Sequence, residues 1–312
     1  MIILLKYKIY SNNIKIITMS KNNNSYIFKI SKNVNLGDGI VYFGFIKQLC
    51  NIDNITYIDL RKKCEETNYI LIGSVLRNCD SNSIICGTGF ISENADLGSL
   101  GWTFKNNVYN VPKNILFVRG KKTRDKFIKM GVNCPESYGD LGLLLPLVYK
   151  MKKSNIYKYK VGILPHYVDK ERLDQIKKFL NDNNISYTIL NIMSAHKCQN
   201  LINELSECEF LITSTLHGII LGIAYNIKTI WIKFSSQVTG NDFKYHDFFS
   251  SLDYEYNHVQ LNNIVLDQFI KIPKSNLLNL GLNMITKIPF YISNKCKENR
   301  INEWTNLIKS YY

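Results

Sequence analysis

The string TSTLHG, which begins at Thr213, places hydroxyl side chains, a histidine and a glycine directly after an apolar run. An apolar run that leads into Ser214 and Thr215, followed by a second apolar stretch, predicts a strand, a turn and a helix. The first N–H groups and the positive dipole end of such a helix favour an anion. His217 would add a proton donor or acceptor, because an unperturbed imidazole titrates near neutral pH. A capped helix with a buried His217 would produce the same string, so both interpretations stay open.

A second candidate is the string VRGKKTRD, in which Arg119 ends one expected strand and a helix is expected from Gly120. The chain holds 33 Lys but only 6 Arg, so an Arg at such a junction is informative. A guanidinium offers a planar fork that binds a carboxylate or phosphate through two hydrogen bonds. Arg124 of the same string fits better as part of a solvated helical turn.

Three further strings place polar residues beside expected turns. Asp38 stands between two glycines in NLGDGI, where it predicts either an N-cap or a ligand-facing carboxylate. His166 follows Pro165 at the end of an apolar strand, a position that commonly faces a cleft. Lys244 and His246 lie in FKYHDFFSS, a mixture of aromatic and charged residues that by itself indicates a surface loop.

Apolar runs of strand length alternate with helical periods, which predicts parallel sheets that bind ligands at the carboxyl ends of their strands. In the first half the expected strands are 25–30, 55–60, 69–71, 83–86 and 114–119, with helices over 40–50 and 120–130. In the second half they are 160–164, 186–191, 209–213 and 229–232, with helices over 170–183, 197–208 and 218–225.

A Lys-rich stretch over 151–160 predicts the boundary between the two halves. We therefore expect an α/β, GT-B-like fold in which two Rossmann-like parallel-sheet domains, 25–150 and 158–274, face a central cleft. We expect the final segment, 275–312, to be helical and to pack across the hinge.

The composition excludes several classes of protein. With 312 residues and 46% hydrophobic content, the chain can bury one large core or two medium ones, and it is neither disordered nor collagen-like. The formal net charge of +14 comes mainly from Lys residues spread along the whole chain. This spread is typical of an AT-rich coding sequence. A small anionic substrate is the second interpretation, and we expect no nucleic-acid partner.

Signals for membranes, secretion and metals are missing from the sequence. No run of 18 apolar residues predicts a transmembrane segment. Lys residues interrupt the apolar first 19 residues, which does not fit a secretory signal. Met19 is an alternative to Met1 as the first residue. Eight Cys without CxxC or zinc-ligand spacing predict buried thiols in a reducing, cytoplasmic compartment. P-loop, GxGxxG, HExxH, GxSxG and DxD motifs are absent, so we expect neither a metal nor a cofactor.

Seven strings, taken in order, resemble the polysaccharide pyruvyl transferase family: NLGDGI, ICGTGF, VRGKKTRD, YGDLGLLLP, VGILPHYVD, ITSTLHGIILGIAYNIKTIWI and FKYHDFFSS. Each string is weak by itself, but seven in register over about 33–251 are specific. The resemblance implies a GT-B-like transferase that uses phosphoenolpyruvate as its donor substrate. Such an enzyme forms a pyruvate ketal across two hydroxyls of a sugar in a glycan or oligosaccharide acceptor.

The resemblance also implies roles for the candidate residues. The donor-binding residues would be Arg119, Ser214, Thr215, Leu216, Gly218 and Lys244. The catalytic residues would be His217, His166 and Asp38, with either histidine as the acid. The acceptor-binding residues would be Asp38, Gly89 and His246. Domain 25–150 would form the acceptor side and part of the donor site, and domain 158–274 the donor side.

One position departs from the family pattern. Many members have Arg two positions before the histidine, where this chain has Thr215. Arg119 or Lys244 would then have to supply the charge that binds the donor carboxylate. The alternative functions are a GT-B glycosyltransferase with a nucleotide-sugar donor, a non-catalytic glycan-binding protein and, more remotely, an RNA-binding protein.

Overall fold

The computed structural model of the chain describes residues 25–31, 35–95, 111–152, 156–260 and 264–311. Within these ranges it contains two parallel sheets, one in each half of the sequence. The alternation of apolar runs and helical periods therefore predicted the α/β class correctly. The first 24 residues, which include the alternative start at Met19, lie outside the described ranges.

The first sheet has five strands in the order β2-β1-β3-β4-β5. They are β1 (Tyr26–Ile30), β2 (Ile55–Asp59), β3 (Asn68–Ile70), β4 (Ser83–Cys86) and β5 (Asn114–Phe117). Each coincides within two residues with an expected apolar run. The chain passes from β1 to β2 on one side and returns to β3 on the other, so the carboxyl ends of β1 and β3 diverge at a switch point where ligands bind in such sheets.

The second sheet has four strands in the order β7-β6-β8-β9. They are β6 (Tyr159–Leu164), β7 (Tyr187–Ile189), β8 (Cys208–Thr213) and β9 (Lys228–Trp231). Its order repeats that of the first sheet, so its switch point lies between β6 and β8.

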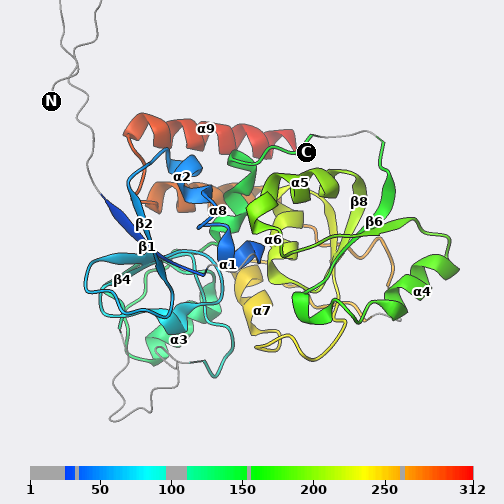
Figure 1. The fold of residues 1–312 in the computed structure, drawn as a ribbon, viewed down its shortest axis with the longest axis horizontal. Helices are drawn as coiled ribbons and strands as arrows, with labels where there is room; N and C mark the ends of the chain where they lie inside the picture. The colour runs from blue at the N-terminus through cyan, green and yellow to red at the C-terminus, as the bar shows by residue number, and fades with distance from the viewer. Residues whose placement is uncertain (1–24, 32–34, 96–110, 153–155, 261–263, 312) are drawn as a thin grey trace, which may run out of the picture.

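Helices of both halves and of the C-terminal segment surround these sheets (Figure 1). The α-helices are α1 (Leu36–Gly39), α2 (Phe45–Cys50), α3 (Lys121–Lys129), α4 (Asp174–Asp182), α5 (Cys198–Ser206), α6 (Leu216–Ala224), α7 (Phe243–Ser250), α8 (Lys274–Lys287) and α9 (Asn294–Ser310). Short 3₁₀ helices are η1 (Leu76–Asn78), η2 (Leu141–Leu147), η3 (Tyr167–Asp169) and η4 (Ala195–Lys197). Figure 1 shows the two sheets on opposite sides of the molecule, with α6 and α7 between them.

Two predicted elements were wrong. The helix expected over 40–50 begins only at Phe45, because residues 40–44 form turns and Gly44 adopts a left-handed conformation (φ 94°) directly before α2. The string FKYHDFFSS is not a surface loop but helix α7, most of which is buried. The Tyr245 ring of α7 stacks on Trp231 with centroids 4.3 Å apart, which fixes this helix against the second sheet.

The C-terminal segment contacts both halves of the chain. Arg300 of α9 donates hydrogen bonds to the Leu49 carbonyl at 2.9 Å and to the Leu147 carbonyl at 3.1 Å, both in the first half. The Tyr311 hydroxyl donates to the Ala224 carbonyl at the end of α6, in the second half. In Figure 1, α9 runs along one edge of the molecule above α2 and α8.

Candidate active site

A pocket of about 220 Å³ lies where the carboxyl ends of both sheets meet. Its described lining residues are Asn35, Ser74, Val75, Arg77, Ile91, His166, Tyr167, Ile192, Thr215, Leu216, His217, Thr239 and Lys244. Most of these residues lie in the segments after β1 and β3 of the first sheet and after β6 and β8 of the second, and the others follow β4, β7 and β9. The pocket therefore joins the two switch points that the strand orders define.

His217 lies in the first turn of α6 and lines this pocket with a side chain that is only 14% exposed. Gly37 of α1 packs against the imidazole so closely that an added Cβ there would overlap the ring. On another side, Nε2 lies 3.8 Å from the Oδ2 atom of the buried Asp140. Burial, together with the nearby Arg119, Lys244 and His166, lowers the pKa of His217 to about 3. The imidazole is therefore neutral at pH 7.

His166 follows β6 and faces the same pocket. Its backbone N–H donates to the Ser214 hydroxyl at 2.9 Å, and its ring lies beside Tyr167. Burial and the positive charge of Lys244 lower the pKa of His166 to about 4, although Asp169 acts in the opposite direction. Both pocket histidines are thus neutral at pH 7.

Two cationic side chains line the pocket together with the two imidazoles. Lys244 of α7 is 7% exposed, and its Nζ lies 5.3 Å from the centroid of the Tyr245 ring. Arg77 of η1 is exposed and lies on the wall that the first sheet contributes. The described lining residues include neither Asp nor Glu. The lining is therefore suited to a small ligand with more than one negative charge.

The predicted donor residue Arg119 does not line this pocket. Its side chain is fully buried, and its three nitrogens donate to Asp247 Oδ2 at 3.0 Å, the Ser74 hydroxyl at 2.6 Å and the Phe90 carbonyl at 2.6 Å. Arg119 follows the end of β5, and in the structure its guanidinium pairs with Asp247, which is 128 residues away in the sequence and could not be predicted from the local string. Arg119 stabilises the loop that carries Ser74, which does line the pocket.

The family model for polysaccharide pyruvyl transferase matches residues 6–236. The chain belongs to this family. It is also similar to a mimivirus protein, "Uncharacterized protein L143" of Acanthamoeba polyphaga mimivirus, with 25% identity over 292 residues that cover 86% of this chain and 94% of that protein. No solved structure matches the chain.

The family match confirms the resemblance of the motif strings and extends it toward the N-terminus. It ends before FKYHDFFSS, so α7 and its pocket residue Lys244 lie beyond the matched range. Of the other residues predicted from the family motifs, His217, His166, Thr215 and Leu216 line the pocket.

The hydroxyls of two predicted donor residues, Ser214 and the pocket-lining Thr215, form hydrogen bonds within the protein. The Ser214 hydroxyl donates to Asp169 at 2.7 Å, and the Thr215 hydroxyl accepts the Gly218 N–H at 2.7 Å as the cap of α6. The N–H of Ile219 donates to the Thr215 carbonyl. The N–H groups of Gly218 and Ile219 are thus already bonded to Thr215, and the anion site at the start of α6 stays a prediction.

The predicted acceptor residues lie elsewhere. Gly89 is buried against the Arg119 guanidinium, and His246 packs edge-on against Trp231 and lines a separate surface hollow. Asp38 belongs to α1, but its side chain lies outside the described part of the structure.

Sequence reasoning missed the pocket residues on the wall of the first sheet, above all Ser74 and Arg77. The signal was present, because Arg77 is one of only six Arg and follows a short buried strand. Among the described residues, no group of three or more His, Cys, Asp or Glu is arranged to hold a metal ion. No helix in the described ranges has the length and hydropathy needed to cross a membrane.

Proposed function

We propose that this chain transfers the pyruvyl group of phosphoenolpyruvate to two hydroxyls of a glycan sugar, with release of phosphate. The observation that carries the proposal is the pocket itself, which combines Arg77, Lys244, His166 and His217 and has no described acidic lining residue. Phosphoenolpyruvate carries a carboxylate and a phosphate on a three-carbon frame. Two cations and two imidazoles in about 220 Å³ match both its charge and its size.

The two histidines supply the proton that the reaction needs. A proton must reach the methylene carbon of the donor while one sugar hydroxyl attacks the adjacent carbon, and a second hydroxyl then displaces phosphate to close the ketal. Both imidazoles are neutral in the empty pocket. A bound dianion beside them favours the charged imidazolium and raises their pKa values toward neutrality. His217 or His166 would then act as the general acid.

We also propose that the molecule is a GT-B-like transferase with its donor and acceptor on opposite sides of the pocket. Residues 158–274 would form the donor side around His166 and His217, and residues 25–150 the acceptor side around α1, where Asp38 would hold a sugar hydroxyl. The segment 275–312 would act as the brace across the hinge. The eight cysteines are all free thiols, which supports a reducing, cytoplasmic compartment.

A donor screen tests the proposal against a nucleotide-sugar glycosyltransferase. Pockets that bury larger ligands typically measure about 300–1,000 Å³, so the pocket seen here is small for a nucleotide sugar. We expect phosphoenolpyruvate, and not UDP- or CMP-linked sugars, to raise the melting temperature and to release phosphate when a hexoside is added. Stabilisation by a nucleotide sugar alone would favour the alternative function.

A further inference from the structure

We propose that Arg77 binds an anionic group of the donor and takes the place of the arginine that this chain lacks at Thr215. The inference rests on the proposed function and identifies which side chain supplies the fork. Arg77 was not among the motif residues, and Arg119, from which the fork was expected, is buried with its nitrogens bonded to other partners.

Arg77 lies in the wall of the pocket, and its guanidinium is available to bind a ligand. It lies in η1, in the segment that follows β3 at the switch point of the first sheet, and lines the pocket. The side chain is exposed, and among the described residues none forms a hydrogen bond or ion pair with its guanidinium. Five N–H donors in a planar fork therefore face a pocket without a described acidic residue.

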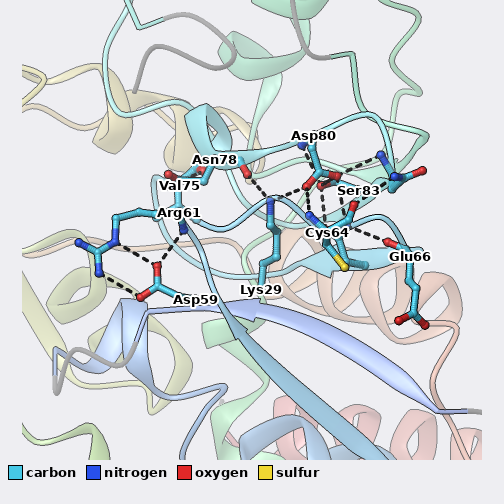
Figure 2. Close-up of polar contacts among 11 residues, drawn as sticks. Lys29, Asp59, Arg61, Cys64, Glu66, Val75, Asn78, Asp80 and Ser83 are labelled. Atoms are coloured by element: carbon cyan, nitrogen blue, oxygen red, sulfur yellow. Dashed lines mark hydrogen bonds and ion pairs between the residues drawn. The ribbon is translucent and has the colours of Figure 1, made fainter. Parts of the chain in front are cut away.

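A buried polar network fixes the C-terminal end of the segment that carries Arg77 (Figure 2). Lys29 is only 4% exposed. Its ammonium group donates to the Asn78 carbonyl at 2.9 Å and to Asp80 Oδ2 at 2.6 Å. The other carboxylate oxygen of Asp80 accepts hydrogen bonds from Asn68 and Ser83 at 3.1 and 3.0 Å. This network therefore fixes the backbone of Asn78, the residue that follows Arg77.

The N-terminal end of the same segment is fixed as firmly. Arg119 donates to the Ser74 hydroxyl, and the Thr88 hydroxyl accepts the Val75 N–H and donates to the Gly73 carbonyl. Anchors on both sides fix the backbone of the segment from which the exposed Arg77 side chain extends. A fixed backbone is what a binding residue needs to hold its geometry.

The pocket residues at the start of α6 and in α7 do not supply a guanidinium. The Thr215 hydroxyl caps α6 by accepting the Gly218 N–H, so it does not replace a guanidinium. Lys244 supplies a point charge without a planar fork. Arg77 is the arginine among the described lining residues, and it approaches the pocket from the opposite sheet.

The test compares Arg77→Gln and Arg77→Lys with Arg172→Gln, a matched control that removes an exposed Arg outside this pocket. Binding of phosphoenolpyruvate and of inorganic phosphate is measured by isothermal titration calorimetry, with melting temperatures recorded in parallel. We expect Arg77→Gln to weaken binding of phosphoenolpyruvate at least tenfold and Arg77→Lys to lie between it and the wild type. The control should bind normally, and all melting temperatures should match, because exposed residues contribute little to stability.

The outcomes separate this inference from the proposed function. Binding of inorganic phosphate that depends on Arg77, with no binding of phosphoenolpyruvate, would support Arg77 as the anion ligand and reject the pyruvyl donor. Equal affinity of wild type and Arg77→Gln for phosphoenolpyruvate would overturn the role of Arg77 and leave the function intact. A wild type that binds neither anion would overturn both.

Discussion

The imidazole of His217 is confined by its neighbours, with Gly37 on one side and Asp140 on another. A histidine that merely filled the core would be expected to satisfy both ring nitrogens, yet Nε2 has no hydrogen-bond partner among the described residues. An imidazole that is neutral, pocket-facing and poorly satisfied is instead suited to gain a proton when an anion binds.

The first prediction concerns Gly37 and His217 together. His217→Ala should lower turnover by about 10²-fold or more, the scale of a positioned acid–base group. Gly→Ala within a helix normally stabilises by about 1 kcal/mol, but at Gly37 the new methyl group would displace the His217 ring. Gly37→Ala should therefore reduce both activity and melting temperature in the wild type and be tolerated in His217→Ala. Additive effects in this double-mutant cycle would show that the two residues do not interact as described.

The second prediction concerns the stability of the fold at acidic pH. The pKa values of His217 and His166 are lowered to about 3 and about 4, whereas an unfolded histidine has a pKa of about 6.5. Below about pH 6.5 the unfolded state therefore binds more protons, and stability is lost as the pH falls toward 4 and then 3. Melting temperatures from pH 8 to 4.5 should fall less steeply for His166→Asn and His217→Asn than for the wild type. Parallel curves for all three proteins would contradict the burial of neutral imidazoles.

At the scale of elements, α7 connects the two halves through a buried ion pair. Arg119 and Asp247 both have fully buried side chains, and the second carboxylate oxygen of Asp247 accepts the Thr123 N–H at 2.7 Å at the start of α3. Gly120 allows this approach, because a Cβ there would overlap the Asp247 carbonyl. The α7 helix thus fixes the position of α3 and of the pocket loops relative to the second sheet.

The third prediction follows from this ion pair. Arg119→Met leaves Asp247 charged and buried without its partner, which should destabilise the fold by about 3–5 kcal/mol. Arg124→Met in α3, the helix that follows Arg119, is the control. The Arg124 side chain is partly exposed and its partner Glu136 is exposed, so the loss of this ion pair and of the hydrogen bond to the Cys134 carbonyl should cost less, about 1–2 kcal/mol. Urea denaturation measures both. Equal, small losses would mean that Arg119 is not the link between α3 and α7.

The strands and the pocket differ in how far the sequence predicts them. Strands such as β4 and β8 were predicted closely, because a buried parallel strand is a short, continuous apolar run. The pocket histidines were found because each follows such a run. Helix α7 and the partner of Arg119 were missed, because buried Lys244 and Asp247 resemble surface residues until contacts over 100 residues away are known.

At the scale of the whole molecule, α8 and α9 act as a brace. The fully buried Trp304 of α9 packs against Gly281 of α8, where no side chain would fit. Arg300 and Tyr311 then connect α9 to elements of both halves. The relative position of the two sheets, and with it the pocket, therefore depends on the last helix of the chain.

The fourth prediction tests this brace. Arg300→Met removes donors from the carbonyls of Gln48, Leu49 and Leu147, which should lower the free energy of unfolding by about 1–3 kcal/mol. Glu303→Gln, which removes only the exposed partner of Arg300, is the control and should be near neutral. An unchanged unfolding midpoint in Arg300→Met would show that α9 docks without these hydrogen bonds.

The fate of the donor carbon distinguishes ketal formation from every other reaction of phosphoenolpyruvate. The protein is incubated with ¹³C-labelled phosphoenolpyruvate and a panel of hexosides, and the products are analysed by mass spectrometry and NMR. We predict release of one phosphate per modified sugar, a mass gain of one pyruvate less one water, and a labelled ketal carbon attached to two sugar oxygens. Arg77→Gln and His217→Ala should form this product slowly. Unmodified sugars throughout the panel, with the labelled phosphoenolpyruvate recovered intact or hydrolysed to pyruvate, would show that the protein does not transfer the pyruvyl group to these sugars.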